Sequence, residues 1–449
     1  MGRAACVVRL RLDLPTGRGV PLEASTQEGA IPDLAAPAHP ARPVERVGWG
    51  FIASYAAAYM GAILLFLAPL LVSLSLKINS LVGIKQAPTS LALVAGTGAL
   101  LALFANPFFG KLSDRTSSRF GMRRPWMVAG LAGGSLGMLV VALAPNIPVV
   151  LVGWCIAQLS FNALLAALVA VLPDQVPVAQ RGHVAGVLGI CLPIASVSGT
   201  FVVQLFDGNR LAVSLAPCAI GGLLILQFAA RLDDRRLTVS ESPAWSRREL
   251  ARTFYVNPRQ HPDFAWAFTS RFLFVLAYAF LTTYQAYYLL EKIGTAEADV
   301  PRQIFLGTLT MAVVIVVASL VGGGLSDRTG RRKVFVCVAS IVFGLAMFVI
   351  AAASSFGGFL VGMAVGGLGF GLYMAVDLAL VADVLPDTNS AAKDLGVMNI
   401  AGALPSAIAP AMAPAILAAG NGSYGVLYAV AGFCAILGAA AILPVRRVR

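Results

Sequence analysis

Long apolar runs separated by short polar segments dominate the chain after residue 48. Each run holds about 20 or more residues, the length that crosses the hydrocarbon of a bilayer as a helix. No water bonds the backbone there, so such runs must be helical. The pattern predicts twelve membrane-spanning helices at residues 49–76, 88–109, 124–144, 147–172, 183–206, 211–230, 265–290, 303–325, 333–353, 357–384, 395–418 and 424–444. The expected fold class is therefore an all-α polytopic membrane protein.

Composition supports this class. Of the 449 residues, 58% are hydrophobic and 12% are charged, whereas about 25% are charged in a typical soluble domain. The six cysteines and three histidines show no metal-binding or disulfide spacing, and no G-x-x-x-x-G-K-[ST] phosphate-binding motif occurs. We expect no metal, no cofactor and no enzymatic activity.

Basic residues are unevenly shared between the loops. With the N-terminus in the cytoplasm, inner segments carry 27 of the 33 lysines and arginines, and outer loops carry five. The positive-inside rule then places both termini in the cytoplasm of an integral, multi-pass plasma-membrane protein, such as one of the bacterial inner membrane. Inner loops that face anionic lipid explain the net charge of +12 without nucleic acid as a partner.

Two short phrases recur at one offset of 213 residues. Asp114 and Asp327 share L-S-D-R, and L-P-D ends at Asp174 and at Asp387. The repeat predicts two parallel six-helix units, at 47–230 and 264–449, joined by an arginine-rich cytoplasmic linker at 231–263. Residues 1–46, rich in proline, alanine and glycine, are expected to form a disordered cytoplasmic tail.

The doubled phrase G-x-L-S-D-R, followed by paired arginines, resembles the signature of the major facilitator superfamily across residues 49–444. Its two copies are Gly110, Asp114, Arg115, Arg119, Arg123 and Arg124, and then Gly324, Asp327, Arg328, Arg331 and Arg332. The resemblance implies a gate at the cytoplasmic helix ends, which Asp174, Arg181, Asp387, Lys393 and Asp394 would join. We expect the first glycine of each copy to let helix ends approach closely. We expect the aspartates to cap a helix or to pair with arginine. The alternative is that these charges only fix the topology.

A finer resemblance is carried by S-D-R-T-S-S-R-F-G-M-R-R-P-W, P-D-Q-V-P-V-A-Q-R-G and A-V-D-L-A-L-V-A-D-V-L-P-D. These segments look like the glycoside–pentoside–hexuronide cation symporters and the sucrose–proton symporters, although Met122 stands where another arginine is common. The resemblance implies alternating-access symport of a glycoside or related solute. The second span has no acidic residue, unlike sodium-coupled members, which favours protons as the driving ion.

Two ionisable side chains, Arg271 and Asp377, fall inside predicted spans. Each is costly at mid-bilayer unless it is paired or hydrated. At 1.5 Å per residue both lie about 10 Å from the inner boundary, so we expect them to face each other. A carboxylate released from its arginine takes up a proton more readily. The pair is therefore a candidate for proton coupling, and a purely structural ion pair is the alternative.

Amide and aromatic side chains inside the spans are candidate substrate contacts. Gln158 and Asn162 share one helix face, and amides both donate and accept hydrogen bonds, as sugar hydroxyls require. The candidates are Gln158, Asn162, Tyr55, Tyr59, Tyr278, Tyr284, Gln285 and Tyr373. The alternatives are interhelical hydrogen bonds and an interfacial aromatic belt, to which we assign Tyr287 and Tyr288.

Taken together, the sequence favours a monomeric transporter in the lipid bilayer that carries a small polar solute with protons. A proton-driven exporter of amphipathic compounds, a lysolipid transporter on the same fold and a non-transporting receptor are the alternatives. The arginine that faces Asp377 argues against export of apolar cations, for which an unpaired carboxylate is better suited.

Overall fold

The computed structural model describes residues 46–234, 259–384 and 391–445, without the side chains at 178, 327, 378–379, 382–384 and 391–396. Most of the predicted linker lies outside the described residues, as do Asp387 and the side chains of Asp327, Lys393 and Asp394. The predicted tail at 1–46 also lies outside the described residues, except for Arg46. What the sequence assigns to these positions remains an expectation.

Twelve helices in the described residues are long and apolar enough to cross a membrane. This confirms the predicted all-α polytopic fold class. The elements are α1 (Trp49–Ala68), η1 (Pro69–Ser73), α2 (Leu74–Val82), α3 (Ala87–Ser113), α4 (Arg124–Leu143), α5 (Ile147–Gln175), α6 (Val178–Leu205), α7 (Arg210–Arg231), α9 (Pro262–Tyr288), η3 (Leu289–Ile293), η4 (Glu297–Asp299), α10 (Val300–Thr329), α11 (Arg332–Ala352), α12 (Phe356–Val384), α13 (Ala391–Ala419) and α14 (Tyr424–Ile442).

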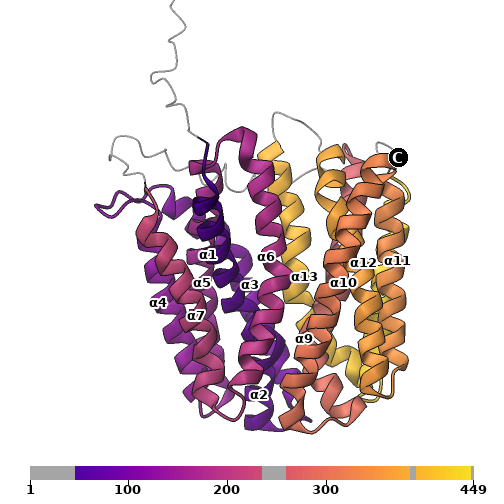
Figure 1. The fold of residues 1–449 in the computed structure, drawn as a ribbon. Coiled ribbons are helices and arrows are strands. Elements are labelled where there is room, and N and C mark those ends of the chain that lie inside the picture. The colour runs from indigo at the N-terminus through magenta and orange to yellow at the C-terminus, as the bar shows by residue number, and fades with distance from the viewer. Residues whose placement is uncertain (1–45, 235–258, 385–390, 446–449) are drawn as a thin grey trace, which may run out of the picture. The chain divides into compact units, whose positions relative to one another are not determined.

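Figure 1 shows α1–α7 as one bundle and α9–α14 as a second beside it. The bundles meet along two seams, α3 against α13 and α6 against α10. We call the end where α3 leads into α4 the arginine end, after Arg123 and Arg124. The opposite end, where α9 finishes with Tyr287 and Tyr288, is called the tyrosine end.

The first span is longer than its predicted range of 49–76. It runs from Trp49 to Val82 through the short π-helical segment η1. Pro69 begins that segment, and its missing N–H disturbs the regular ladder of helical hydrogen bonds. Lys77 stays within the last turns of the span because its Nζ donates to the carbonyl of Ala142 at 2.9 Å.

Small residues set the closest helix contacts. A Cβ on Gly61 of α1 would lie 2.8 Å from the carbonyl oxygen of Gly221 on α7, and a Cβ on Gly137 of α4 would lie 2.6 Å from that of Gly153 on α5. In a bilayer the hydrophobic effect does not drive helices together, so close backbone packing at small residues contributes more of the stability. These glycines fix the bundle that positions the site.

Candidate functional site

An ion pair joins α9 to α12 inside the membrane-spanning region. Arg271 Nη1 lies 2.9 Å from Asp377 Oδ2, and the two side chains are 20% and 9% exposed. One turn earlier on α12, the Tyr373 hydroxyl hydrogen-bonds to the same carboxylate. The Tyr373 ring stacks on Phe274 with 3.8 Å between centroids. Three predicted site residues thus form one cluster, in which a buried carboxylate has a cation and a neutral donor as partners.

A cavity of about 320 Å³ lies between the bundles, with walls from α1, α3, α5, α9 and α13. The side chains that line it within the described residues carry no charge. Its polar lining consists of Asn106, Trp154, Gln158, Asn162, Thr282, Thr283, Asn399 and Ser406. Such a wall can hydrogen-bond a neutral polar molecule but offers no counter-ion to a charged one.

Helix α5 presents three polar side chains to this cavity at four-residue intervals: Trp154, Gln158 and Asn162. Asn162 Nδ2 donates to the carbonyl oxygen of Gln158 at 2.8 Å and to its Oε1 at 3.3 Å. The arrangement leaves the Gln158 amide nitrogen as a donor and Asn162 Oδ1 as an acceptor. The two amides that the sequence predicts are thus placed together at the cavity wall.

Trp154 was not predicted from the sequence, although it occupies the same face. It is 1% exposed, and its Nε1 has no hydrogen-bond partner among the described residues. The indole lies against Gly98 of α3, where a Cβ would be 2.2 Å from Nε1. Asn106 and Asn399 were missed as well, although a single polar residue in an apolar run is itself a signal.

The remaining predicted substrate contacts are dispersed. Tyr55 is fully buried, donates its hydroxyl to the carbonyl of Leu168 at 3.0 Å and stacks on Phe228. It therefore packs α1 against α5 and α7. Tyr59 is half-buried on α1, one turn from Tyr55, and is not part of the cavity lining.

A second, smaller cavity of about 30 Å³ lies on another side of α9. Tyr278 and Gln285 line it, and Thr282 borders both cavities. The Gln285 amide nitrogen is buried without a partner in the described residues. A space of this size holds about one or two water molecules rather than a solute.

Tyrosines of α9 close the tyrosine end. Tyr287 donates its hydroxyl to the carbonyl of Ser75, in the other bundle, at 3.0 Å. Tyr284 donates to the carbonyl of Pro410 at 3.1 Å and lies 3.5 Å from that of Pro88. Tyr284 directly follows Thr283 of the cavity wall, and its hydroxyl reaches Pro88 and Pro410, which lie nearer the tyrosine end than the cavity-lining residues of α3 and α13. It therefore separates the cavity from this end of the molecule.

The belt interpretation of Tyr287 and Tyr288 is wrong. Both side chains are 0% exposed, and the Tyr288 hydroxyl donates to the carbonyl of Ile350 at 2.8 Å. A residue of an interfacial belt would present its ring to lipid. These rings instead fill the space where α9 meets its neighbours, because the apolar pattern alone cannot tell a lipid-facing tyrosine from a packed one.

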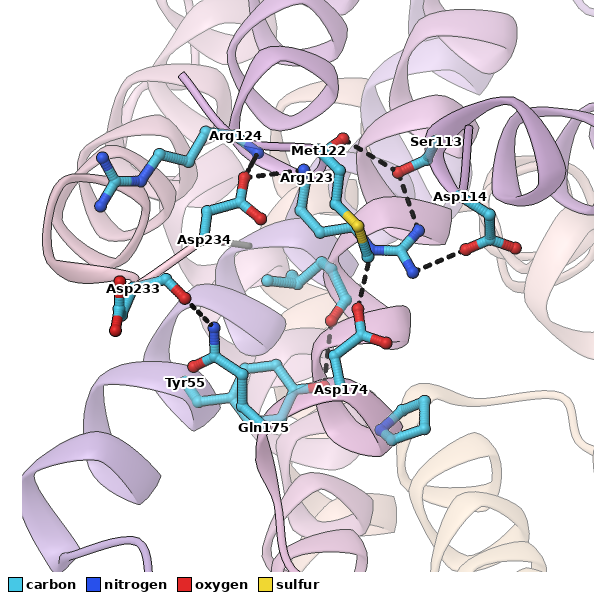
Figure 2. A network of polar contacts seen from close by, with 12 residues as sticks. Tyr55, Ser113, Asp114, Met122, Arg123, Arg124, Asp174, Gln175, Asp233 and Asp234 are labelled. Carbon is cyan, nitrogen blue, oxygen red and sulfur yellow. Dashed lines mark hydrogen bonds and ion pairs between the residues drawn. The ribbon is translucent and has the colours of Figure 1, made fainter. Parts of the chain in front are cut away.

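Arg123 is the centre of the polar network at the arginine end (Figure 2). It is 4% exposed. Its Nη2 lies 2.6 Å from Asp114 Oδ1, its Nε lies 2.9 Å from Asp174 Oδ2, and its Nη1 donates to Ser113 Oγ at 2.9 Å. Asp114 thus pairs with arginine, one of its two predicted roles. The network joins the ends of α3 and α5 to the start of α4.

Other predicted gate residues take different places. Arg181 donates to the carbonyls of Val176 and Pro173, while the Asp174 carboxylate binds Arg123. Arg124 donates to the carbonyl of Leu232. Arg115 is half-buried, and Arg119 is exposed with its guanidinium 4.8 Å from the Phe120 ring centroid.

The predicted close approach at Gly110 and Gly324 is wrong. A Cβ on Gly110 would lie 4.0 Å from the nearest atom, Ala166 Cβ, and one on Gly324 would have nothing within 4 Å. The physical reason is that the tight contacts lie deeper in the bundle, where Gly61 and Gly137 meet backbone.

The second copy of the phrase folds differently from the first. Helix α3 ends at Ser113, so Asp114 is its C-cap, whereas α10 continues through Asp327 to Thr329 and ends at Gly330 with φ +62°. The second-copy arginines lie at this turn: Arg328 and Arg331 are exposed and Arg332 is half-buried. The sequence repeat therefore predicts equivalent positions but not equivalent local geometry.

The arrangement can do two things chemically. The Arg271–Asp377 pair can exchange an ion-pair partner for a proton, and the uncharged cavity can hydrogen-bond a polar solute. A metal site has no support within the described residues, where no group of three or more metal-ligating side chains gathers.

Comparison with known proteins adds a family assignment. The model of the Major Facilitator Superfamily matches residues 47–313 and 298–449. The quinolone resistance protein NorA of Staphylococcus aureus is 31% identical over 112 residues, which are 24% of this chain and 27% of that protein. The sucrose transport protein SUC4 of Arabidopsis thaliana is 40% identical over 57 residues, 13% of this chain and 10% of that protein. The chain thus aligns with less than a third of the length of either relative.

Two solved structures share the fold at low sequence identity. A bacterial homologue of the human lysosomal transporter Spinster, inward-facing and unoccupied, has a TM-score of 0.65 at 14% identity, covering 88% of this chain and 98% of that one. The nucleoside transporter NupG has a TM-score of 0.69 at 12% identity, covering 88% and 99%. With a family match across almost the whole chain and twelve membrane-length helices in two bundles, this multi-pass membrane protein belongs to the major facilitator superfamily.

Proposed function

We propose that this protein is a monomeric, proton-coupled symporter that moves a glycoside or a related small, neutral, polar solute across the plasma membrane by alternating access. The arginine end faces the cytoplasm in this proposal, because the basic loops gather there. The tyrosine end is sealed by the contacts of Tyr284 and Tyr287. The end that would face outward is therefore closed in this conformation.

One observation carries the proposal: a buried Arg271–Asp377 pair stands in the same membrane interior as a cavity with a polar but uncharged lining. Amides and hydroxyls that line a water-poor site select a solute with matching hydroxyls, because unmatched polar groups are costly there. The cavity volume is at the lower end of the range for ligand sites, about 300–1,000 Å³. A solute of one or two rings suits such a site.

Asp377 is the group that would carry the proton. In this conformation Arg271 Nη1 contacts the carboxylate at 2.9 Å, and a cation at that distance favours the ionised form. If a rearrangement within the second bundle, which holds both α9 and α12, withdraws the arginine, the carboxylate faces a low-dielectric surrounding without a cation, and protonation becomes favourable. Solute binding and proton binding would then favour the same conformation, which is what symport requires.

The test is uptake of a panel of radiolabelled glycosides by proteoliposomes with an imposed proton gradient. Wild type and Asp377→Asn are compared in gradient-driven uptake and in exchange of solute at equal pH. We expect the variant to lose gradient-driven uptake and to keep exchange, because the asparagine is neutral like the protonated aspartate. If no glycoside moves under either polarity of the gradient, the proposal fails.

A second candidate, export of amphipathic compounds, is favoured by the partial match to the quinolone resistance protein NorA and by the alanine and leucine side chains of the cavity wall. Proton-driven efflux of a quinolone from the same proteoliposomes, without glycoside uptake, would support it. The ion pair distinguishes the candidates, because Arg271 raises the cost of placing a cationic drug near Asp377.

A further inference from the structure

Asp234, three residues beyond the end of α7, caps a helix to which it is not directly connected. Its Oδ2 accepts hydrogen bonds from the backbone N–H groups of Arg123 and Arg124, each at 2.7 Å. These residues are the N-cap and the first residue of α4, and the N-cap side chain makes no capping bond of its own. The first amides of a helix lack partners inside it, and the helix dipole favours a carboxylate there. Asp234 supplies that cap from 111 residues away.

The loop before α4 is shaped around this carboxylate. Gly121 has φ +99°, and a Cβ built on it would lie 2.2 Å from Asp234 Oδ2 and 2.5 Å from Asp234 Cβ. Glycine is the residue that adopts such a backbone conformation without strain and leaves this space empty. The loop therefore has room for the Asp234 side chain because residue 121 has none.

Two further contacts fix the segment that carries Asp234. The Arg124 guanidinium donates to the carbonyl of Leu232, and Gln175 Nε2 donates to the carbonyl of Asp233 at 2.7 Å. Leu232 is itself 1% exposed. The first residues after α7 are thus attached to the start of α4 and to the end of α5.

Arg123 is consequently held from two sides (Figure 2). Its backbone N–H is bonded to Asp234, while its guanidinium contacts Asp114 and Asp174. Asp234 makes its bonds to the main chain, so the geometry of the two ion pairs depends on it through the position of the Arg123 backbone.

We propose that Asp234 is the positioning residue of the arginine-end network. It fixes the first turn of α4 so that a single guanidinium reaches Asp114 and Asp174 together. It also makes the start of the connection between the bundles part of the same network. Displacement of residues 232–234 then weakens the ion pairs that join α3 and α5 to α4, and the gate depends on where the connection is docked.

The test is a double-mutant cycle on the thermal unfolding of the purified full-length protein, which needs no substrate and is independent of the proposed transport function. Asp234→Ala and Asp174→Asn are made singly and together, and the cycle is repeated with Arg123→Ala. Asp234 and Asp174 bond different parts of Arg123, so a simple cap predicts additive effects. If Asp234 is a positioning residue, Asp174→Asn should lower the unfolding midpoint of the Asp234→Ala variant by less than roughly half of what it lowers the midpoint of the wild type.

The Arg123→Ala background makes the cycle decisive. Alanine keeps the N–H that Asp234 binds and removes the guanidinium that Asp174 binds. The coupling should vanish there, while the direct effect of Asp234→Ala persists. Asp233→Asn is the matched control and should be silent, because that residue takes part through its carbonyl. Asp234→Asn should recover most of the loss, because asparagine is also a good cap.

Hydrogen exchange of the native protein provides a second readout if the alanine variant does not fold. Asp234→Asn replaces a charged acceptor with a neutral one, so exchange in peptides across 121–128 should become faster than in Asp233→Asn. Additive midpoints in both backgrounds overturn the proposal, and so does unchanged exchange in this segment.

Discussion

The hydroxyl of Tyr287 donates a hydrogen bond to the carbonyl oxygen of Ser75 at 3.0 Å and thereby joins the two bundles at the tyrosine end. Its neighbour Tyr288 is equally buried and donates to Ile350 at 2.8 Å, within its own bundle. Two adjacent tyrosines thus make similar bonds, of which one joins α9 to α2 of the other bundle and would have to break for the tyrosine end to open in the proposed transport cycle.

Tyr287→Phe should shift the protein toward a conformation open at the tyrosine end. The change removes one buried hydrogen bond, about 1 kcal/mol, or roughly a fivefold change in equilibrium. The carbonyl of Ser75 loses a partner that exists in the closed conformation. A cysteine placed at Ser406 in a cysteine-free background should react severalfold faster with an impermeant maleimide added at the tyrosine end.

Tyr288→Phe is the matched control for that experiment. It removes an equally buried hydroxyl and costs similar stability, but its bond to Ile350 lies within one bundle. Equal labelling in the two variants would show that the bond to Ser75 does not hold the conformation.

Loss of one partner of the Arg271–Asp377 pair should destabilise the protein more than loss of both. Removing one member of a buried pair leaves an uncompensated charge and typically costs about 3–5 kcal/mol, whereas replacing both with neutral groups is often close to neutral. Arg271→Gln, Asp377→Asn and the double variant should be compared by thermal unfolding in detergent. We expect Arg271→Gln to be the least stable, because it leaves a carboxylate that is 9% exposed without its cation.

An alternative result would revise this picture. If the double variant unfolds at a lower temperature than Arg271→Gln, the ion pair stabilises the protein by more than the compensation of two buried charges. Retention of proton-driven transport in the double variant would also remove Asp377 from the coupling mechanism.

The helices could be predicted from the sequence because the bilayer leaves few choices for an apolar run of this length. Arg271 and Asp377 were equally accessible to prediction, since an intramembrane charge is costly and their depths could be counted. Which tyrosines face a cavity, lipid or a neighbouring helix could not be predicted. That depends on the rotation of each helix, which small residues such as Gly61 and Gly98 determine through contacts distant in sequence.

The arginine-end network illustrates the same limit. The phrase around Asp114 indicated an ion pair with an arginine but not which arginine among several. Asp234 carries no motif of its own, and its role follows from the meeting of the α7 end with the α4 start. A cap supplied from 111 residues away is invisible to local patterns.

Gly61→Ala should destabilise the first bundle. The new Cβ would lie 2.8 Å from the Gly221 carbonyl oxygen and 3.1 Å from its Cα, and backbone atoms cannot move aside as a flexible side chain can. Overpacking of this kind costs about 1–3 kcal/mol. Gly189→Ala is the control, because a Cβ there meets nothing within 4 Å and alanine favours the helix by up to about 1 kcal/mol. The unfolding midpoint should fall in the first variant and hold or rise in the second, and a fall in both would point to helix distortion instead.

Trp154→Phe should weaken solute binding while the fold is kept. The change retains an aromatic ring against Gly98 and removes the Nε1–H, which is buried without a partner in the described residues on a side chain that lines the cavity. If a solute oxygen accepts that hydrogen bond, its loss costs about 0.5–1.5 kcal/mol, or roughly two- to twelvefold in affinity. KM for glycoside uptake should rise by this factor.

Trp126→Phe is the control, since the Trp126 Nε1 already donates to Thr116 Oγ1 at 2.7 Å and Trp126 is not among the cavity-lining residues. Deoxy analogues of the transported glycoside identify the oxygen that accepts this hydrogen bond. The analogue without that oxygen should bind wild type and Trp154→Phe equally well. If the affinity for every analogue falls by the same factor from wild type to Trp154→Phe, the indole acts through packing, and the N–H is not a solute contact.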